Sequence, residues 1–158
     1  FEAWCGETEG ALLQLAALLL DPEASAKASD ASGHGGIALA VSTILADLPR
    51  TRARGQCWIP ADILAACGLA RETFVAGSDG KAVANAVAAF SEKGLKHFSH
   101  FKEATMGMPK TLRPAFLPVF AAKLALERAN GQPQDVQSNG VAVSNLRKFL
   151  SMARVAVF

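Results

Sequence analysis

The chain has 158 residues, which is enough for one domain with a sizeable hydrophobic core. Hydrophobic residues make up 51% of it, with Ala, Leu and Val dominant and no Tyr, a composition that favours packed helices over β-sheets. The formal net charge of +2 excludes the strongly basic character expected of a nucleic-acid-binding domain.

Hydrophobic spacing predicts a first helix at about residues 2–20. Asp21 and Pro22 mark its end, because the residue before a proline avoids the α conformation. The apolar run within it, 11–20, is about half as long as a bilayer crossing, so we interpret it as a buried helix. Residues 24–31 are expected to form a short helical or irregular segment. The glycine-rich stretch 32–36 then predicts a flexible corner.

A stronger helix is predicted at about residues 36–48. Its apolar stripe follows helical spacing and consists of Ile37, Val41, Ile44, Leu45 and Leu48. The opposite face carries Gly36, Ala40, Thr43 and Asp47. Pro49 is expected to end this helix, and residues 50–58, which contain three alternating arginines, are expected to form a loop.

Further helices are predicted at about residues 60–68, 70–76, 81–105, 112–128 and 143–155. Pro118 is expected to kink the fourth of these, and a polar loop is expected at 130–140. The last helix is basic and amphipathic. With neither internal repeats nor a break in composition, the sequence predicts a single helical domain over residues 1–158. Since the chain does not begin with Met, we expect it to be part of a longer protein.

The cysteines and histidines give little support for a disulfide framework or a zinc site. Cys5, Cys57 and Cys67 are odd in number and irregularly spaced, which predicts reduced thiols in a cytoplasmic protein. His97 and His100 are three residues apart on a predicted helix, and no third ligand stands near them in the sequence.

The stretch from Gly36 to Leu69 carries the most informative pattern in the chain. Its distinctive residues are Ile44, Leu45, Asp47, Arg54, Gly55, Ile59, Pro60, Asp62, Leu64, Gly68 and Leu69. They stand at matching positions in the second aspartate-rich region of squalene and phytoene synthases, which this stretch resembles. In that family a helix of the form Q-x-x-N-x-x-x-D-x-x-x-D runs into a basic R-G-x-x-Y-L-P segment. The preceding helix, with Glu7, Gly10, Ala11 and Leu12, resembles the family helix before this region, so the resemblance extends over about residues 1–104.

The resemblance implies an all-α fold, an isoprenoid-synthase-type helical bundle of which this chain is the C-terminal half. It also implies a prenyltransferase of isoprenoid biosynthesis that joins two prenyl diphosphates head to head. Two carboxylates four residues apart share one face of a helix and would hold Mg²⁺ against the diphosphate. An apolar cavity would shelter the carbocation.

Site residues follow from the family positions. Asp47 is the expected metal ligand. The expected diphosphate-binding residues are Arg50, Arg52 and Arg54, and the expected cavity-lining residues are Glu7, Gly10, Ala40, Thr43 and Trp58. The sequence also allows a plainer interpretation of each. Asp47 can form an ion pair with a nearby arginine, and the arginines can form ion pairs with surface acids. Glu7 can be an acidic residue that the helix dipole stabilises near a helix N-terminus, and Trp58 can pack in the core.

The family motif is damaged in this sequence. Thr51 stands where the second carboxylate belongs, and Pro49 is expected to break the helix between it and Asp47. Ala40 and Thr43 replace the family's Gln and Asn, and Trp58 replaces the Tyr of the Y-L-P segment. No D-x-x-x-D occurs anywhere in the chain. The sequence therefore predicts impaired catalysis and leaves open whether the protein is an enzyme.

A branch of the same superfamily, the mitochondrial complex I assembly factors and their bacterial relatives, shows a similar loss. The segments that resemble this branch are 5–13, 54–60 and 113–117. Two hypotheses stay open: a prenyl-diphosphate-processing enzyme or its remnant that uses Mg²⁺, or a non-catalytic assembly or lipid-binding protein that needs no cofactor. Expected partners are a prenyl diphosphate or other isoprenoid lipid, a protein, and a membrane surface touched by the C-terminal basic helix of a cytoplasmic protein. The oligomeric state is left open.

Overall fold

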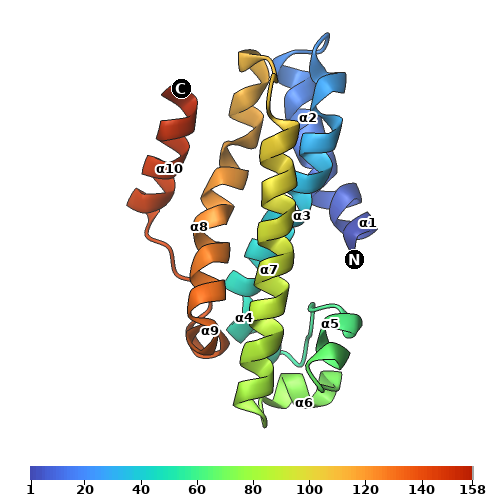
Figure 1. The fold of residues 1–158 in the computed structure, drawn as a ribbon, viewed down its shortest axis with the longest axis vertical. Coiled ribbons are helices and arrows are strands. Elements are labelled where there is room, and N and C mark those ends of the chain that lie inside the picture. Colours follow the sequence, from blue (N-terminus) through green and yellow to red (C-terminus); the bar gives the residue numbers. More distant parts are fainter. Residues whose placement is uncertain (158) are drawn as a thin grey trace.

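Helices account for most of the structure, a computed structural model that describes residues 1–157 (Figure 1). The α-helices are α1 (Glu2–Cys5), α2 (Ala11–Leu20), α3 (Ser29–Ala46), α4 (Leu48–Ala53), α5 (Ala61–Ala66), α6 (Arg71–Ala76), α7 (Gly80–Ala104), α8 (Leu117–Gly131), α9 (Pro133–Asn139) and α10 (Asn145–Val157). A π-helical turn, η1 (Gly6–Gly10), joins α1 to α2, and two 3₁₀ segments, η2 (Ser25–Ala28) and η3 (Lys110–Phe116), precede α3 and α8. No residue from 1 to 157 lies in a strand, so the predicted all-α fold is confirmed.

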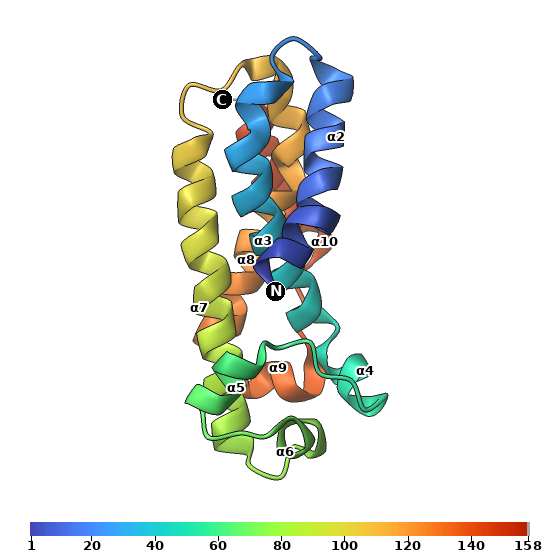
Figure 2. The same cartoon turned by 90° about the vertical axis from the view of Figure 1, so that its right-hand side faces the viewer.

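Helix α3 lies at the centre of the bundle, with α2, α7 and α8 running alongside it (Figures 1 and 2). The shorter helices α4, α5, α6 and α9 gather at one end, and α10 lies on the outside against α8. None of the helices in residues 1–157 combines the length and the apolar composition that a membrane crossing needs. The prediction of a single domain within a longer protein stays a prediction.

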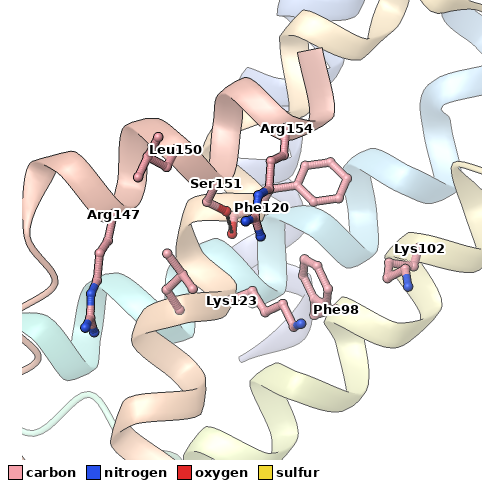
Figure 3. Close-up of a pocket in the computed structure, with 9 residues that line it drawn as sticks. Phe98, Lys102, Phe120, Lys123, Arg147, Leu150, Ser151 and Arg154 are labelled. Carbon is pink, nitrogen blue, oxygen red and sulfur yellow. Dashed lines mark hydrogen bonds between the residues drawn. The ribbon is translucent and has the colours of Figure 1, made fainter. Parts of the chain in front are cut away.

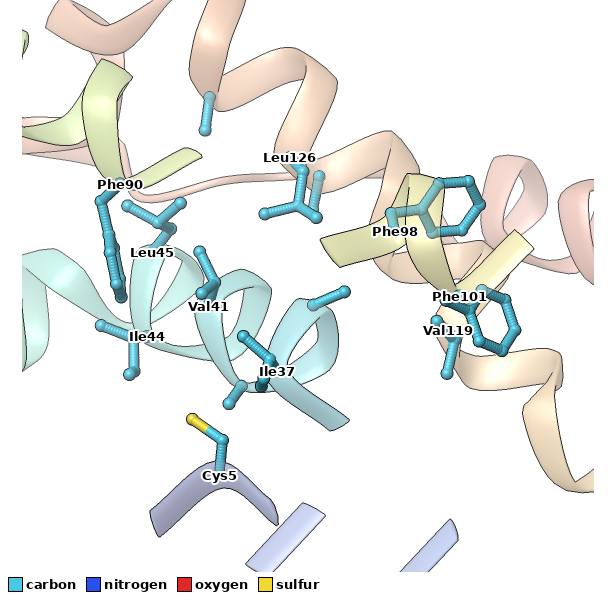
Figure 4. Packing of buried hydrophobic residues seen from close by; sticks show 14 of the residues in the cluster. Cys5, Ile37, Val41, Ile44, Leu45, Phe90, Phe98, Phe101, Val119 and Leu126 are labelled. Atoms are coloured by element: carbon cyan, nitrogen blue, oxygen red, sulfur yellow. The ribbon is translucent and has the colours of Figure 1, made fainter. Parts of the chain in front are cut away.

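The apolar stripe of α3 forms the middle of the core. All five predicted stripe residues are buried, which confirms the periodicity: Ile37, Val41, Ile44 and Leu45 lie on α3, and Leu48 is the first residue of α4. Figure 4 shows side chains of α3 between Cys5 of α1 on one side and Phe90 of α7 and Leu126 of α8 on the other. Because neighbouring helices bury α3 on several sides, small residues such as Ala38 and Ala40 are buried with it.

The flexible corner predicted at residues 32–36 is wrong, since α3 begins at Ser29 and runs through it. Two of the glycines there, Gly35 and Gly36, allow close packing. A Cβ on Gly35 would lie 3.1 Å from the Phe101 ring, and one on Gly36 would lie 2.5 Å from the backbone nitrogen of Gly10. Helix propensity is a weak preference that tertiary contacts override, and here they hold the glycines in a helix.

The interpretation of residues 11–20 as a buried helix is also wrong. Only Leu13 and Ala17 of α2 are buried. The exposed leucines are Leu12, Leu15, Leu18, Leu19 and Leu20, and we call them the α2 leucine face. Apolar composition had suggested burial, whereas α2 lies at the outside of the bundle (Figure 2) and covers α3 with one side only.

Three prolines begin helices where the sequence predicted a helix end, a kink and a polar loop, respectively. Pro49, Pro118 and Pro133 all lie in the first turn of α4, α8 and α9. A proline is tolerated there because its missing N–H would have had no partner inside the helix. The predicted loop 50–58 is therefore helical up to Ala53, Pro118 starts a helix rather than kinking one, and most of the polar stretch 130–140 belongs to α8 and α9.

Candidate functional site

The predicted metal ligand, Asp47, lies at the turn between α3 and α4. The backbone N–H of Thr51 donates to the carbonyl of Asp47 at 3.0 Å, so the chain is helical from Leu48 to Ala53 and the interruption falls at Asp47 rather than between Asp47 and Thr51. The Asp47 carboxylate accepts a hydrogen bond from Nη1 of Arg50 at 2.9 Å. Both side chains are largely exposed, so this ion pair stabilises the fold little but occupies the carboxylate.

The side chains at this turn do not fit a Mg²⁺ site. The hydroxyl of Thr51, which stands at the position of the second family carboxylate, donates to the carbonyls of Asp47 and Leu48 at 3.3 and 3.1 Å. Mg²⁺ at a diphosphate site usually binds through one or two carboxylates together with waters and phosphate oxygens, and this turn supplies a single carboxylate, Asp47, which pairs with Arg50. Among residues 1–157, no three His, Cys, Asp or Glu side chains are arranged so that they could hold a metal ion.

The three arginines of α4 diverge. Arg50 pairs with Asp47, and Arg54 is exposed at the end of α4. Arg52 turns toward α6, where its guanidinium lies 5.4 Å from the ring centroid of Phe74 and donates to the carbonyl of Val75 at 3.4 Å. The buried Nε of Arg52 has no hydrogen-bond partner in the described structure. The contact with Phe74 makes Arg52 a link between two short helices.

The five residues predicted to line a cavity have different surroundings. Gly10 packs against the backbone of Gly36, and Ala40 is buried within α3. Thr43 is exposed, and its hydroxyl donates to the carbonyl of Leu39 at 3.0 Å. Glu7 is exposed on η1. The predictions that these residues line a cavity and that the arginines bind diphosphate remain untested.

Trp58 is about half exposed and stacks on Trp4, with 6.2 Å between ring centroids and 19° between ring planes. The pair joins the segment before α5 to the N-terminal helix. Because Trp58 is about half exposed, it does not pack in the core, and the prediction that it lines a cavity stays a prediction.

A histidine cluster that the sequence did not reveal lies between α3 and α7. Nδ1 of His34 and Nδ1 of His97 are 3.0 Å apart, and the ring centroid of His100 is 5.1 Å from that of His34. Nε2 of His97 lies 3.7 Å from the carboxylate of Glu2, which also accepts a hydrogen bond from Lys93. Burial lowers the pKa of His97, and the hydrogen bond from Lys93 lowers the pKa of Glu2. His34 stands 63 positions before His97, so nothing in the local sequence could have shown the contact.

All three cysteines are free thiols, as the sequence predicted. Cys5 is buried in the core, and burial raises its pKa to about 11. A thiol that stays protonated at neutral pH is a poor nucleophile, so Cys5 acts as a small apolar residue.

The sequence model of the squalene/phytoene synthase family matches residues 1–147. The chain therefore belongs to the squalene/phytoene synthase family. It is also similar to a mouse protein, NADH dehydrogenase (ubiquinone) complex I, assembly factor 6, with 24% identity over 151 residues that cover 96% of this chain and 45% of the relative. The chain thus spans less than half the length of that relative. No solved structure matches it.

Proposed function

We propose that this chain belongs to a non-catalytic member of the squalene/phytoene synthase family that acts by binding other molecules during the assembly of a protein complex. The observation that carries the proposal is the arrangement around Asp47. Its carboxylate is held by Arg50, the adjacent Thr51 hydroxyl bonds to backbone, and Arg52 is stacked on Phe74. Activation of a diphosphate needs carboxylate-bound metal and cations aimed at one point, and these side chains are engaged elsewhere.

The relative named as a complex I assembly factor supports the second half of the proposal. The binding partner of such an assembly factor would be a subunit or subassembly of a respiratory NADH dehydrogenase. The α2 leucine face suits a protein partner, because Leu12, Leu15 and Leu19 are 63%, 51% and 77% exposed and no charged residue lies within α2. Contiguous exposed apolar patches mark interaction surfaces more often than chance.

The first test is diphosphate release by the full-length protein. We expect that farnesyl or geranylgeranyl diphosphate with Mg²⁺ releases no pyrophosphate above the enzyme-free background, because one paired carboxylate is a poor metal site. An active squalene or phytoene synthase serves as the positive control. Metal-dependent formation of a squalene- or phytoene-type product that Asp47→Asn abolishes would overturn the proposal.

A further inference from the structure

Helices α7, α8 and α10 line an open cleft of about 560 Å³ on the side of the bundle (Figure 3). We call it the α10 cleft. Its lining consists of Phe98, Lys102, Phe120, Lys123, Leu124, Arg147, Leu150, Ser151 and Arg154. The lining combines an apolar floor with four cationic side chains and contains no carboxylate.

Aromatic packing builds the floor of the α10 cleft. The rings of Phe98 and Phe120 meet edge to face, with 5.8 Å between centroids. The hydroxyl of Ser151 donates to the carbonyl of Phe120 at 3.2 Å, which ties α10 to α8. Figure 3 shows Lys102 and Lys123 on the α7 and α8 sides of the cleft and Arg147 and Arg154 descending from α10.

The positive charge of the α10 cleft is largely uncompensated. Lys123 pairs with Glu127 at 3.1 Å, and it is the one of the four cations with a carboxylate within ion-pair distance in the part of the chain that the structure describes. Beyond Asp135 the sequence has no acidic residue, whereas α10 carries Arg147, Lys148 and Arg154. An anion at the cleft would therefore meet several donors for charge-assisted hydrogen bonds.

The outer side of α10 adds apolar groups beside this charge. Leu146, Phe149 and Leu150 are 67%, 63% and 51% exposed, and they follow helical spacing. Basic helices with exposed Leu and Phe bind in the interface plane of anionic bilayers, where cations meet phosphates and apolar side chains enter the acyl region. The α2 leucine face lacks such cations, so charge distinguishes the two surfaces.

We propose that the α10 cleft and the exposed side of α10 together bind anionic phospholipid at a membrane surface. The cations Arg147, Arg154 and Lys102 are spread along the cleft and meet the phosphates of anionic headgroups, and an acyl chain lies toward Leu150 and the floor of the cleft. Phe149 and Leu146 insert beside it. The occupant is a bilayer lipid, because the cations of the cleft suit its phosphate and the same helix, α10, also carries the exposed apolar residues that suit its acyl region.

Vesicle co-sedimentation of the full-length protein tests this site. We expect binding to vesicles of phosphatidylcholine with phosphatidylglycerol, weakening as salt rises, and little binding to phosphatidylcholine alone. The double variant Arg147→Gln/Arg154→Gln should bind the anionic vesicles about tenfold more weakly. The matched control, Arg71→Gln/Arg128→Gln, removes the same charge from exposed positions outside the cleft and should bind like the parent protein.

A second pair of variants tests insertion. Phe149→Ser should weaken binding to anionic vesicles, whereas Leu12→Ser, an equally exposed position on α2, should not. Circular dichroism and thermal unfolding establish that each variant is folded. Equal binding to both kinds of vesicle, or equal losses in the cleft variants and their controls, would overturn the proposal.

Discussion

The backbones of α3 and η1 approach each other at Gly36 and Gly10 more closely than any side chain would permit. A Cβ on Gly36 would lie 2.5 Å from the nitrogen and 2.7 Å from the Cα of Gly10. Backbone atoms cannot rotate away as the end of a flexible side chain can, so the two helical segments would have to separate. This single residue thus determines how the N-terminal helix seats on the central one.

We expect Gly36→Ala to lower the free energy of unfolding by about 1–3 kcal/mol, as overpacking in a well-packed core does. The matched control is Gly33→Ala in the same helix, where an added Cβ meets nothing within 4 Å. The free energy of unfolding of Gly33→Ala should rise by about 0.5–1 kcal/mol, because alanine loses less backbone entropy than glycine when a helix forms. Urea unfolding curves measure both. A neutral Gly36→Ala would show that α1 and η1 are not seated on α3 in this way.

Asp47 shows how far a single position can be interpreted without a structure. The spacing of Asp47 and Arg50 allowed an ion pair at the end of a helix, and the structure contains it. Arg52 is also an arginine and lies two positions after Arg50, yet it contacts Phe74, which lies 22 positions further along the chain. Local spacing predicts the first contact, whereas the second depends on how α6 folds back on α4.

At the scale of helices, the histidine cluster makes the contact between α3 and α7 sensitive to acid. The Nδ1 atoms of His34 and His97 face each other, so one must donate and the other accept, and two doubly protonated rings would oppose two N–H groups. Glu2, Lys93 and His100 surround the pair. Among these, Lys93 and His100 add to the cost of a charged His97, and Glu2 reduces it.

Because burial lowers the pKa of His97 below its ordinary value in the folded state, the unfolded chain binds this proton more readily. Stability is therefore greatest above about pH 6.5 and is lost as the pH falls through that value toward the folded pKa. We expect the free energy of unfolding to be lower at about pH 5.5 than at about pH 7.5.

The variant His97→Gln should flatten this dependence, as measured by urea unfolding at the two pH values. The lowered pKa of Glu2 affects the free energy of unfolding over a lower pH range, because the stabilisation from the ionised Glu2 carboxylate is lost only below about pH 4.5. An unchanged slope in His97→Gln would assign the pH dependence to other groups.

Considering the whole molecule, the two helices that carry exposed apolar residues, α2 and α10, lie on different sides of the bundle (Figure 1). The α2 leucine face lacks charge, and α10 combines exposed apolar residues with three cations. The proposed contacts with a partner protein and with anionic lipid would therefore use different helices. Their separation would allow both to be occupied at once.

A rescue experiment in the source organism separates binding from catalysis at this scale. We expect loss of the full-length protein to lower the amount of assembled NADH dehydrogenase on native gels. Asp47→Asn should restore assembly as well as the parent protein does, because the proposed role uses no Asp47-bound metal. A triple variant of the α2 leucine face, Leu12→Ser/Leu15→Ser/Leu19→Ser, should fold but should not restore the amount of assembled NADH dehydrogenase. Rescue that depends on Asp47 would favour a catalytic role instead.

The all-α class, the buried stripe of α3, the long helix α7 and the family could all be predicted from the amino-acid sequence. These rest on periodic burial and on short motifs, which are properties of neighbouring residues. It also showed that the family carboxylate is missing at Thr51, because that is a fact of residue type. It did not reveal the course of the backbone at 32–36 and 49–53, since glycine and proline signal a turn only when no tertiary contact favours a helix.

Only the tertiary structure decided which residues meet. It brought His34 to His97, Trp4 to Trp58 and Arg52 to Phe74, each across a long sequence separation. It also exposed the leucines of α2, whose composition alone predicts burial. The physical reason is that burial and pairing depend on which helix packs on which face, and that choice is made by the whole set of contacts rather than by any local segment.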